Sequence, residues 1–313
     1  MSELIPPVVG IGPGLVKVGE THPEMVFVIA DNDKAIGGGP FRDRFPERVF
    51  DVGIAEQNMV MTSAGMATAG KLPFCNAFGN FLALRCAEQI RTFVAHTRLN
   101  VKLIGGLAGV SGGKEGPTHE AQEDIAHMRA VPELVVLSPT DVVSVEKAVI
   151  AAAEWKGPVY IRVGRMPAGV FYDQSYTFRI GKADLARQGN GATIISTGVM
   201  LGPALEAAAK LASNGLEVRV LDMQTIKPLD NEAVLAAAKE TGAIVTAEEH
   251  TIVGGLGGAV AEFLSENYPT PVVRVGINDV YAETGVPEQL MEAYGLTADN
   301  IVRAVRRALE LKR

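Results

Sequence analysis

The stretch Asp-Val-Gly-Ile-Ala-Glu-Gln-Asn-Met, residues 51–59, predicts a strand that turns directly into a helix. The strand is expected to end near Val52, Gly53 loosens the turn, and the helix is expected to begin near Ala55. Glu56 then lies in the first helical turn at the carboxyl end of a strand, where open parallel sheets bind their ligands. On spacing alone, the more common role of such a Glu is to complement the helix dipole.

Short apolar runs alternate with longer amphipathic or Ala-rich segments along the chain. Strands are expected over residues 26–30, 101–104, 134–137, 159–163, 193–196, 217–221, 243–246 and 272–275. Helices are expected over residues 56–69, 84–96, 121–129, 141–154, 204–213, 231–239, 258–267, 288–294 and 298–311, with Asp141, Asp230 and Thr297 as N-caps. Continuous apolar strands separated by helices are typical of mainly parallel sheets covered on both faces, so the predicted class is α/β.

The helical period is lost between residues 165 and 190, a stretch that contains several Gly residues. We therefore predict two doubly wound domains. The first comprises residues 1–172 and has a mainly parallel sheet with helices on both faces. A linker covers residues 173–187, and a smaller α/β domain covers residues 188–313.

The composition is that of an ordinary globular protein, with 313 residues, 47% of them hydrophobic, and a formal net charge of -7. Lys and Arg are scattered, so no nucleic-acid-binding surface is predicted. No apolar run is long enough to span a bilayer, and the first residues lack the pattern of a secretion signal, so no membrane partner is expected. Cys75 and Cys86 have neither disulfide-framework nor zinc spacing and are expected to be free thiols in a cytoplasmic protein.

A second candidate site lies in Pro-Phe-Cys-Asn-Ala-Phe-Gly-Asn-Phe, residues 73–81. Phe78 and Phe81 lie three residues apart around a Gly-Asn pair, in a chain with only 6% aromatic residues. A turn from strand to helix could present both rings to a flat ligand. Packing in the core is the usual alternative for Phe.

The third candidate is the loop Gly-Gly-Lys-Glu-Gly-Pro-Thr-His-Glu, residues 112–120. It is too polar for a core segment, and polar residues on loops of a rigid scaffold are often functional. His119 is the best candidate for a general acid or base in the chain. A mobile surface loop with a solvated His is an equally good interpretation of the pattern alone.

Two weaker signals follow other predicted strands. Arg162 and Arg165 lie at a strand end, where a cation could hold a substrate anion, although one of them is expected to be an ordinary surface Arg. Glu248-Glu249-His250 precedes a Gly-rich turn and suits either a domain interface or the edge of a site. The chain has neither a GxxxxGK[ST] phosphate loop nor a Gly-Asp-Gly metal–diphosphate motif.

Taken together, these motifs resemble those of the pyrimidine-binding and C-terminal domains of the transketolase family. The resemblance runs from Phe27 to about Ala308. It comprises residues 51–59, Phe-x-x-Phe, Glu-Gly-Pro-Thr-His, the strand that follows Gly157-Pro158 and leads to Arg165, and residues 226–230, in family order. It implies thiamine diphosphate as cofactor and, as reaction, the transfer of a two-carbon ketol unit from a ketose to an aldose.

The resemblance assigns four side chains to the cofactor. Glu56 is expected to hydrogen-bond the aminopyrimidine ring and must be protonated to donate. Phe78 is expected to stack on that ring, with Phe81 beside it, and Asp31, after the first strand, completes the set. Both Glu56 and His119 are expected to be catalytic.

Substrate contacts follow from the same resemblance. His119 is expected to contact the reacting carbonyl or hydroxyl group and to move protons, and Arg165 to bind a sugar phosphate. Glu115 and His250 are expected to complete the contacts with the sugar.

A partner subunit is also implied. In the family, a domain bearing Gly-Asp-Gly holds the diphosphate and its metal, and this chain has no such motif and no metal ligands of its own. We therefore expect an N-terminal-section partner that carries Mg²⁺ or Ca²⁺, in an α2β2 assembly around a homodimer core. This chain then resembles the C-terminal section, or small subunit, of a split transketolase.

The sequence departs from the family pattern at three places: Glu115 stands where an acceptor-binding Asp is usual, Leu107 near the position of a phosphate-binding His, and residues 8–10 where an Arg is expected. These changes favour a sugar other than the usual phosphorylated pentoses, or phosphate contacts from the partner. The alternatives are a deoxyxylulose-phosphate synthase-like C-terminal half, a 2-oxo acid dehydrogenase beta-like subunit, and a non-catalytic regulatory or scaffold subunit.

Overall fold

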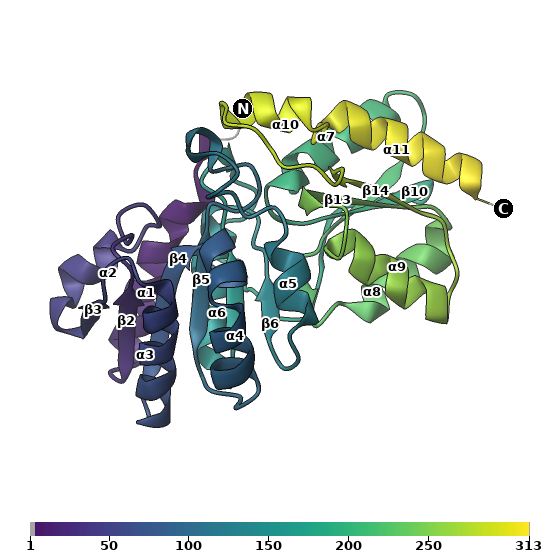
Figure 1. The fold of residues 1–313 in the computed structure, drawn as a ribbon. Helices are drawn as coiled ribbons and strands as arrows, with labels where there is room; N and C mark the ends of the chain where they lie inside the picture. Colours follow the sequence, from purple (N-terminus) through teal and green to yellow (C-terminus); the bar gives the residue numbers. More distant parts are fainter. Residues whose placement is uncertain (1–3, 313) are drawn as a thin grey trace.

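The computed structural model describes residues 4–312, which form two α/β units (Figure 1). The first sheet has the spatial order β12 (Thr225–Lys227), β6 (Val135–Leu137), β7 (Val159–Arg162), β5 (Lys102–Gly106), β4 (Leu72–Phe78), β2 (Met25–Ile29) and β3 (Val49–Asp51). The second has the order β14 (Val272–Ile277), β13 (Ile244–Thr251), β10 (Ala192–Ser196), β11 (Val218–Asp222) and β9 (Asp184–Arg187). The edge strands β12 and β9 pair antiparallel and all other pairs in these two sheets are parallel, which confirms the predicted α/β class.

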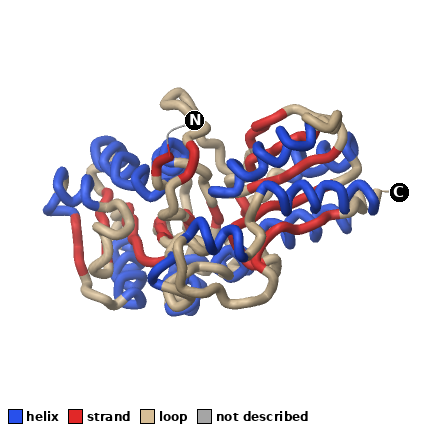
Figure 2. Tube along the Cα trace, turned by 90° about the horizontal axis from the view of Figure 1, so that it is seen from above, coloured by secondary structure: helices blue, strands red, loops and turns tan. Residues whose placement is uncertain are grey.

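Helices cover both faces of the first sheet. One face carries α1 (Ile11–Thr21), α2 (Gly39–Arg44) and α6 (Val142–Glu154). The other carries α3 (Glu56–Thr68), a helical stretch made of η3 (Phe81–Arg85), α4 (Ala87–Gln89) and η4 (Ile90–Ala95), and α5 (Asp124–Ala130). Figure 2, seen from above, shows helices on both sides of the strands.

The second sheet is covered in the same way. On one face lie α7 (Leu201–Ala212), α10 (Pro287–Ala293) and α11 (Ala298–Leu311), and on the other α8 (Asn231–Thr241) and α9 (Leu256–Asn267). Short 3-10 turns and a two-stranded ribbon complete the described elements: η1 (Pro7–Gly10), η2 (Pro46–Arg48), η5 (Gly113–Glu115), η6 (Gly198–Met200), and β1 (Leu4–Ile5) paired with β8 (Ala168–Gly169).

The three predicted caps are confirmed. The Asp141 side chain accepts from the Ser144 amide at 2.7 Å, Asp230 caps α8 and Thr297 caps α11. Helix α1 was not predicted, because its Gly-Ile-Gly-Pro-Gly start is typical of a loop. It forms because glycine lets it pack closely on α6: a Cβ at Gly10 would lie 2.1 Å from the Val142 carbonyl oxygen.

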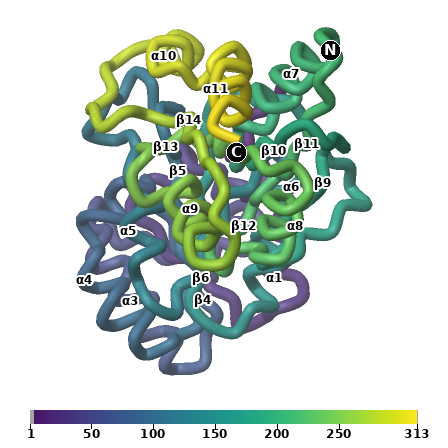
Figure 3. Tube along the Cα trace, turned by 90° about the vertical axis from the view of Figure 1, so that its right-hand side faces the viewer, coloured from purple at the N-terminus to yellow at the C-terminus, as the bar shows by residue number. Residues whose placement is uncertain are grey.

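The two units are joined by more than a linker. Strand β12 lies in the second half of the chain but pairs with β6 of the first sheet. Residues 184–187, at the end of the predicted linker, form the edge strand β9. One apolar cluster also contains buried side chains from both units, among them Tyr160, Leu221 and Ile226, and Figure 3 shows the units packed against each other. No helix within residues 4–312 is long and apolar enough to cross a membrane.

Candidate active site

Glu56 begins α3, just beyond the carboxyl end of β3, as the sequence predicts. The turn before it is held by Asp51, whose Oδ1 accepts hydrogen bonds from the Gly53 amide at 3.0 Å and the Asp31 amide at 3.1 Å. Gly53 has a φ of 72°, which a side chain would strain, and Asp31 itself has a φ of 58°. This turn directs Glu56 inward, where its side chain is 3% exposed.

Arg85 is the direct partner of Glu56. Its Nη1 donates to Glu56 Oε2 at 2.6 Å, and its guanidinium carbon lies 4.0 Å from the centre of the Phe81 ring. The Arg85 side chain is 44% exposed. Sequence reasoning missed this residue. The predicted helix begins at residue 84, whereas the helical stretch of the structure begins at Phe81 and so places Phe81 and Arg85 on one continuous helical segment.

Phe78, Phe81 and His119 form one aromatic cluster. The Phe78 and Phe81 ring centres lie 5.7 Å apart, and the His119 ring lies 5.6 Å from Phe78 and 5.1 Å from Phe81. Phe78 ends β4 and Phe81 opens the following helical stretch. Asn80 ties this turn to the His119 loop, because its Nδ2 donates to the Thr118 carbonyl at 3.1 Å.

The loop that carries His119 is shaped by left-handed backbone and braced by the second unit. Leu107, Gly109, Gly113 and Gly116 all have positive φ. The Gly285 amide donates to the Gly113 carbonyl at 3.3 Å, and a Cβ at Gly116 would lie 2.5 Å from the Thr284 hydroxyl. The loop is therefore braced by residues 284–287, which lie far away in sequence.

Glu115 of this loop forms an ion pair with Arg165, which follows β7. Both carboxylate oxygens of Glu115 lie 2.7 Å from Arg165 Nη2, which also contacts the Gly112 carbonyl at 3.3 Å. Burial alone would raise the pKa of Glu115, but the hydrogen bond and charge of Arg165, together with His119, outweigh burial and lower it. Leu107 is 1% exposed, so its position offers an apolar side chain in the core instead of a cation.

Glu120, directly after His119, is a second residue that sequence reasoning passed over. It is 1% exposed, one oxygen accepts from Gln122 Nε2 at 3.1 Å, and the other has no partner among the described residues. Burial raises the pKa of Glu120. The sequence of the loop, residues 112–120, contains no signal that distinguishes the buried Glu120 from the more exposed Glu115.

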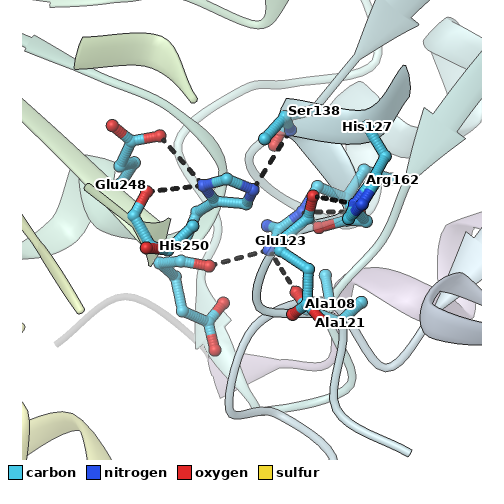
Figure 4. A network of polar contacts seen from close by, with 12 residues as sticks. Ala108, Ala121, Glu123, His127, Ser138, Arg162, Glu248 and His250 are labelled. Carbon is cyan, nitrogen blue, oxygen red and sulfur yellow. Dashed lines mark hydrogen bonds and ion pairs between the residues drawn. The ribbon is translucent and has the colours of Figure 1, made fainter. Parts of the chain in front are cut away.

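His250 is not brought to this site. Its side chain is fully buried between the units, where Nε2 accepts from the Ala126 amide at 3.3 Å and Nδ1 donates to the Thr251 carbonyl at 2.7 Å. Figure 4 shows the surrounding network, in which Glu248 and Arg162 are labelled. The strand β13 continues to Thr251, so the residues expected beyond its end lie within it and face the interior.

The neighbours of His250 are structural as well. Glu248 accepts from the Leu256 and Gly257 amides at 2.7 and 2.8 Å and so caps α9. Arg162 is 3% exposed and contacts Asp124 at 3.0 Å, which makes it an interior residue and leaves Arg165 as the Arg at the site. Arg162 is therefore not the ordinary surface Arg expected for one of the two residues, and the role of Arg165 toward an anion stays a prediction.

The site as a whole presents a buried carboxyl edge and aromatic faces, with an imidazole and an Arg–Glu pair on the adjoining loop. A flat heteroaromatic ring with polar atoms on its edge fits such a cradle: the aromatic rings take its face and Glu56 its edge.

Comparison with known proteins defines the class. Residues 10–169 match the family model of the transketolase pyrimidine-binding domain, and residues 181–301 match that of the transketolase C-terminal domain. The fold is therefore that of a pyrimidine-binding α/β domain followed by a second α/β domain. The chain belongs to the transketolase family.

Its relatives include proteins made as separate sections. The chain is 41% identical to the 6-deoxy-6-sulfo-D-fructose transketolase subunit of Clostridium sp. (strain MSTE9), covering 95% of this chain and 92% of the relative. It is 40% identical to a putative transketolase C-terminal section of Methanocaldococcus jannaschii, covering 95% and 94%. A solved split-gene transketolase, described as an inactive beta4 tetramer, has a TM-score of 0.93 at 44% identity and covers 99% of this chain and 100% of that one. The predicted likeness to a split transketolase is confirmed.

Proposed function

We propose that this chain is one subunit of a thiamine-diphosphate-dependent transketolase, which transfers a two-carbon ketol unit from a ketose to an aldose acceptor. The observation that carries the proposal is the grouping of Glu56, Phe78, Phe81 and His119 at one edge of the first sheet. The relatives named as transketolase subunits or sections support it.

The cradle suits the aminopyrimidine end of the cofactor. Phe78 and Phe81 supply apolar faces, and the Glu56 carboxyl, 3% exposed, lies where it can contact the ring edge away from water. The bound cofactor supplies the carbanion stabilisation needed to break and remake a carbon–carbon bond. Asp31 contributes through the turn that it shares with Asp51, which sets the approach to Glu56.

His119 and the Glu115–Arg165 pair serve the sugar. His119 Nδ1 lies 2.9 Å from the Thr118 hydroxyl, and Nε2 makes no hydrogen bond to any residue in the range 4–312. That nitrogen is the one we assign to proton exchange with the sugar oxygen. Arg165 offers a cation to a phosphate or another anionic sugar end, and Glu115 an acceptor for hydroxyl groups.

A partner subunit completes the enzyme. We assign the diphosphate and its Mg²⁺ or Ca²⁺ to an N-terminal-section subunit with a Gly-Asp-Gly motif, in an α2β2 assembly. The words "subunit" and "C-terminal section" in the names of the relatives support this division. Cys75 and Cys86 are free and buried, which supports a reducing, cytoplasmic setting.

The test is reconstitution. The chain is mixed with the N-terminal-section subunit from the same organism, thiamine diphosphate and Mg²⁺, and ketol transfer is assayed with phosphorylated and unphosphorylated sugars. We expect activity with the wild type and a loss of about 10²- to 10⁴-fold in kcat for Glu56→Gln, because a carboxamide cannot exchange the proton. The control is Glu266→Gln, at an exposed position of α9, which should stay fully active.

A non-catalytic scaffold predicts a different pattern. In that case neither the wild type nor the variant would turn over any sugar, although the two subunits would still associate. Equal activity of the wild type and Glu56→Gln would instead remove Glu56 from the mechanism.

A further inference from the structure

The Arg85 side chain makes two contacts at once in the cofactor cradle. Nη1 donates to Glu56 Oε2 at 2.6 Å, and the guanidinium carbon lies 4.0 Å from the centre of the Phe81 ring. Glu56 and Phe81 are the carboxyl and one of the aromatic rings that the proposed function assigns to the aminopyrimidine. The guanidinium of Arg85 therefore already contacts both the carboxyl and the ring that the aminopyrimidine would use.

A guanidinium resembles an aminopyrimidine in the properties that this cradle can recognise. It is planar and delocalised, it carries N–H donors along its edge, and it stacks on aromatic faces. We propose that Arg85 occupies the aminopyrimidine position of the cofactor-free chain and must leave when thiamine diphosphate binds. The inference rests on the proposed function and concerns what competes with the cofactor.

The local structure allows this departure. The Arg85 side chain is 44% exposed, whereas that of Glu56 is 3% exposed, so the cation can rotate into water and the carboxyl cannot. The Arg85 backbone is fixed separately, because its carbonyl accepts from Gln57 Nε2 at 3.0 Å. A moving side chain on an anchored backbone changes the cradle without disturbing α3.

The chemistry of Glu56 also requires the departure. An ion pair with a guanidinium uses the carboxylate form, whereas the proposed role needs a carboxyl that carries a proton to the ring. The ion pair and the catalytic state therefore exclude each other. While Arg85 occupies the cradle, only the fraction of molecules with an open cradle can bind the cofactor.

The test is cofactor affinity, measured without sugar by titration calorimetry on the complex of this chain with its N-terminal-section partner and Mg²⁺. Arg85→Met removes the charge and the donors but keeps a long apolar side chain. Because the apparent Kd is the intrinsic Kd divided by the open fraction, we expect the Kd of Arg85→Met for thiamine diphosphate to fall about 3- to 10-fold. Arg91→Met is the matched control, since Arg91 lies exposed on η4 and makes no ion pair with any of residues 4–312, and it should leave the Kd unchanged.

Unchanged or weaker binding by Arg85→Met would overturn the proposal, because Arg85 would then be neutral or a cofactor-holding residue. Arg85→Gln serves if the Met variant does not fold, with the same expected direction. Failure of the proposed function looks different: the wild-type complex would not bind thiamine diphosphate at all. A crystal structure of the wild-type complex with the cofactor gives a second readout, in which Arg85 Nη1 should lie beyond hydrogen-bond distance of Glu56.

Discussion

Glu115 neutralises Arg165 within the chain: both of its carboxylate oxygens lie 2.7 Å from Arg165 Nη2. The two side chains are about one third exposed, at 35% and 33%. An anionic sugar end that approaches Arg165 meets a cation that already has a counter-ion. Glu115, which stands where an Asp is usual in the family, thus lies where it would weaken the binding of an anion by Arg165.

The first prediction is that Glu115→Gln favours charged sugars. Removing the competing carboxylate from a pair that is about one third exposed is worth about 1 kcal/mol or less, so we expect KM for a phosphorylated acceptor to fall about 2- to 5-fold at low salt. KM for the matching unphosphorylated acceptor should not fall. The measurement is steady-state kinetics on the reconstituted complex, and equal changes for both acceptors would show that Glu115 does not compete for Arg165.

The second prediction concerns the brace between the units. Gly116 has a φ of 73°, and a Cβ there would lie 2.5 Å from the Thr284 hydroxyl, so Gly116→Ala both strains and displaces the loop of Glu115 and His119. We expect kcat to fall about 10- to 100-fold through misplacement of His119, with the fold retained. The matched control is Gly39→Ala, which meets no atom within 4 Å and should keep full activity. Full activity of Gly116→Ala would contradict the role of the brace.

Much of this fold was open to prediction because local signals and tertiary packing agree. The apolar run that became β2 is buried at every residue, and Asp141 caps its helix as a local motif. Helix α1 escaped prediction because its glycines are local helix breakers whose benefit, close packing on α6, exists only in the folded chain. The edge strand β12 escaped because it pairs outside its own unit.

Some residues of the candidate site are marked by local sequence signals, and others are revealed only by contacts in the folded chain. Glu56, Phe78 and His119 could be found because each lies in a motif at a predicted strand end or in a polar loop. Arg85 could not, since an exposed helical Arg has no distinguishing pattern and only the 2.6 Å contact reveals it. His250 was assigned to the substrate by the family resemblance, and its position beyond the predicted strand 243–246 left open an interface or a site edge. Strand β13 continues to Thr251, and this longer strand places the His250 side chain in the interior between the units.

The third prediction follows from the neutral imidazole of His250. Burial lowers the pKa of His250 to about 4, a shift to which the Arg162 charge adds and which the Asp124 charge opposes, while Glu248 Oε2 lies 3.6 Å from Nδ1. The unfolded chain binds the proton near pH 6.5 and the folded chain only near pH 4, so stability is lost as the pH falls through this window. We expect a loss of about 3 kcal/mol between pH 6.5 and 4, relative to a variant without this group.

His250→Gln supplies that variant, because an amide can accept from Ala126 and donate to the Thr251 carbonyl as the imidazole does. Urea unfolding of both proteins at several pH values gives the difference in free energy of unfolding. Parallel pH profiles for the two proteins would show that His250 takes up no proton on unfolding in this range.

The fourth prediction concerns the buried ion pair between Arg162 and Asp124. Arg162, 3% exposed, holds Asp124 at 3.0 Å with Nε, and its Nη2 donates to the carbonyls of Ala121 and Glu249 at 3.0 and 2.7 Å. Arg162→Met leaves the Asp124 carboxylate buried without a cation, so we expect a loss of about 3–5 kcal/mol in the free energy of unfolding. Asp124→Asn in the same chain removes the orphaned charge, and the double variant should therefore recover part of that loss.

The control for the Arg162–Asp124 pair is the Arg129–Glu262 ion pair, which is more exposed to solvent. Arg129 donates to both oxygens of Glu262, at 2.7 and 2.6 Å, but Glu262 is 63% exposed. Water can replace Arg129 there, so Arg129→Met should cost only about 1 kcal/mol, most of it from the lost contact with the Gly254 carbonyl. Urea unfolding of the wild type and of the four variants (Arg162→Met, Asp124→Asn, their double variant and Arg129→Met) compares the two sites directly. Equal losses at both Arg residues, or simple additivity of Arg162→Met and Asp124→Asn, would show that packing rather than a buried charge joins the two units at this point.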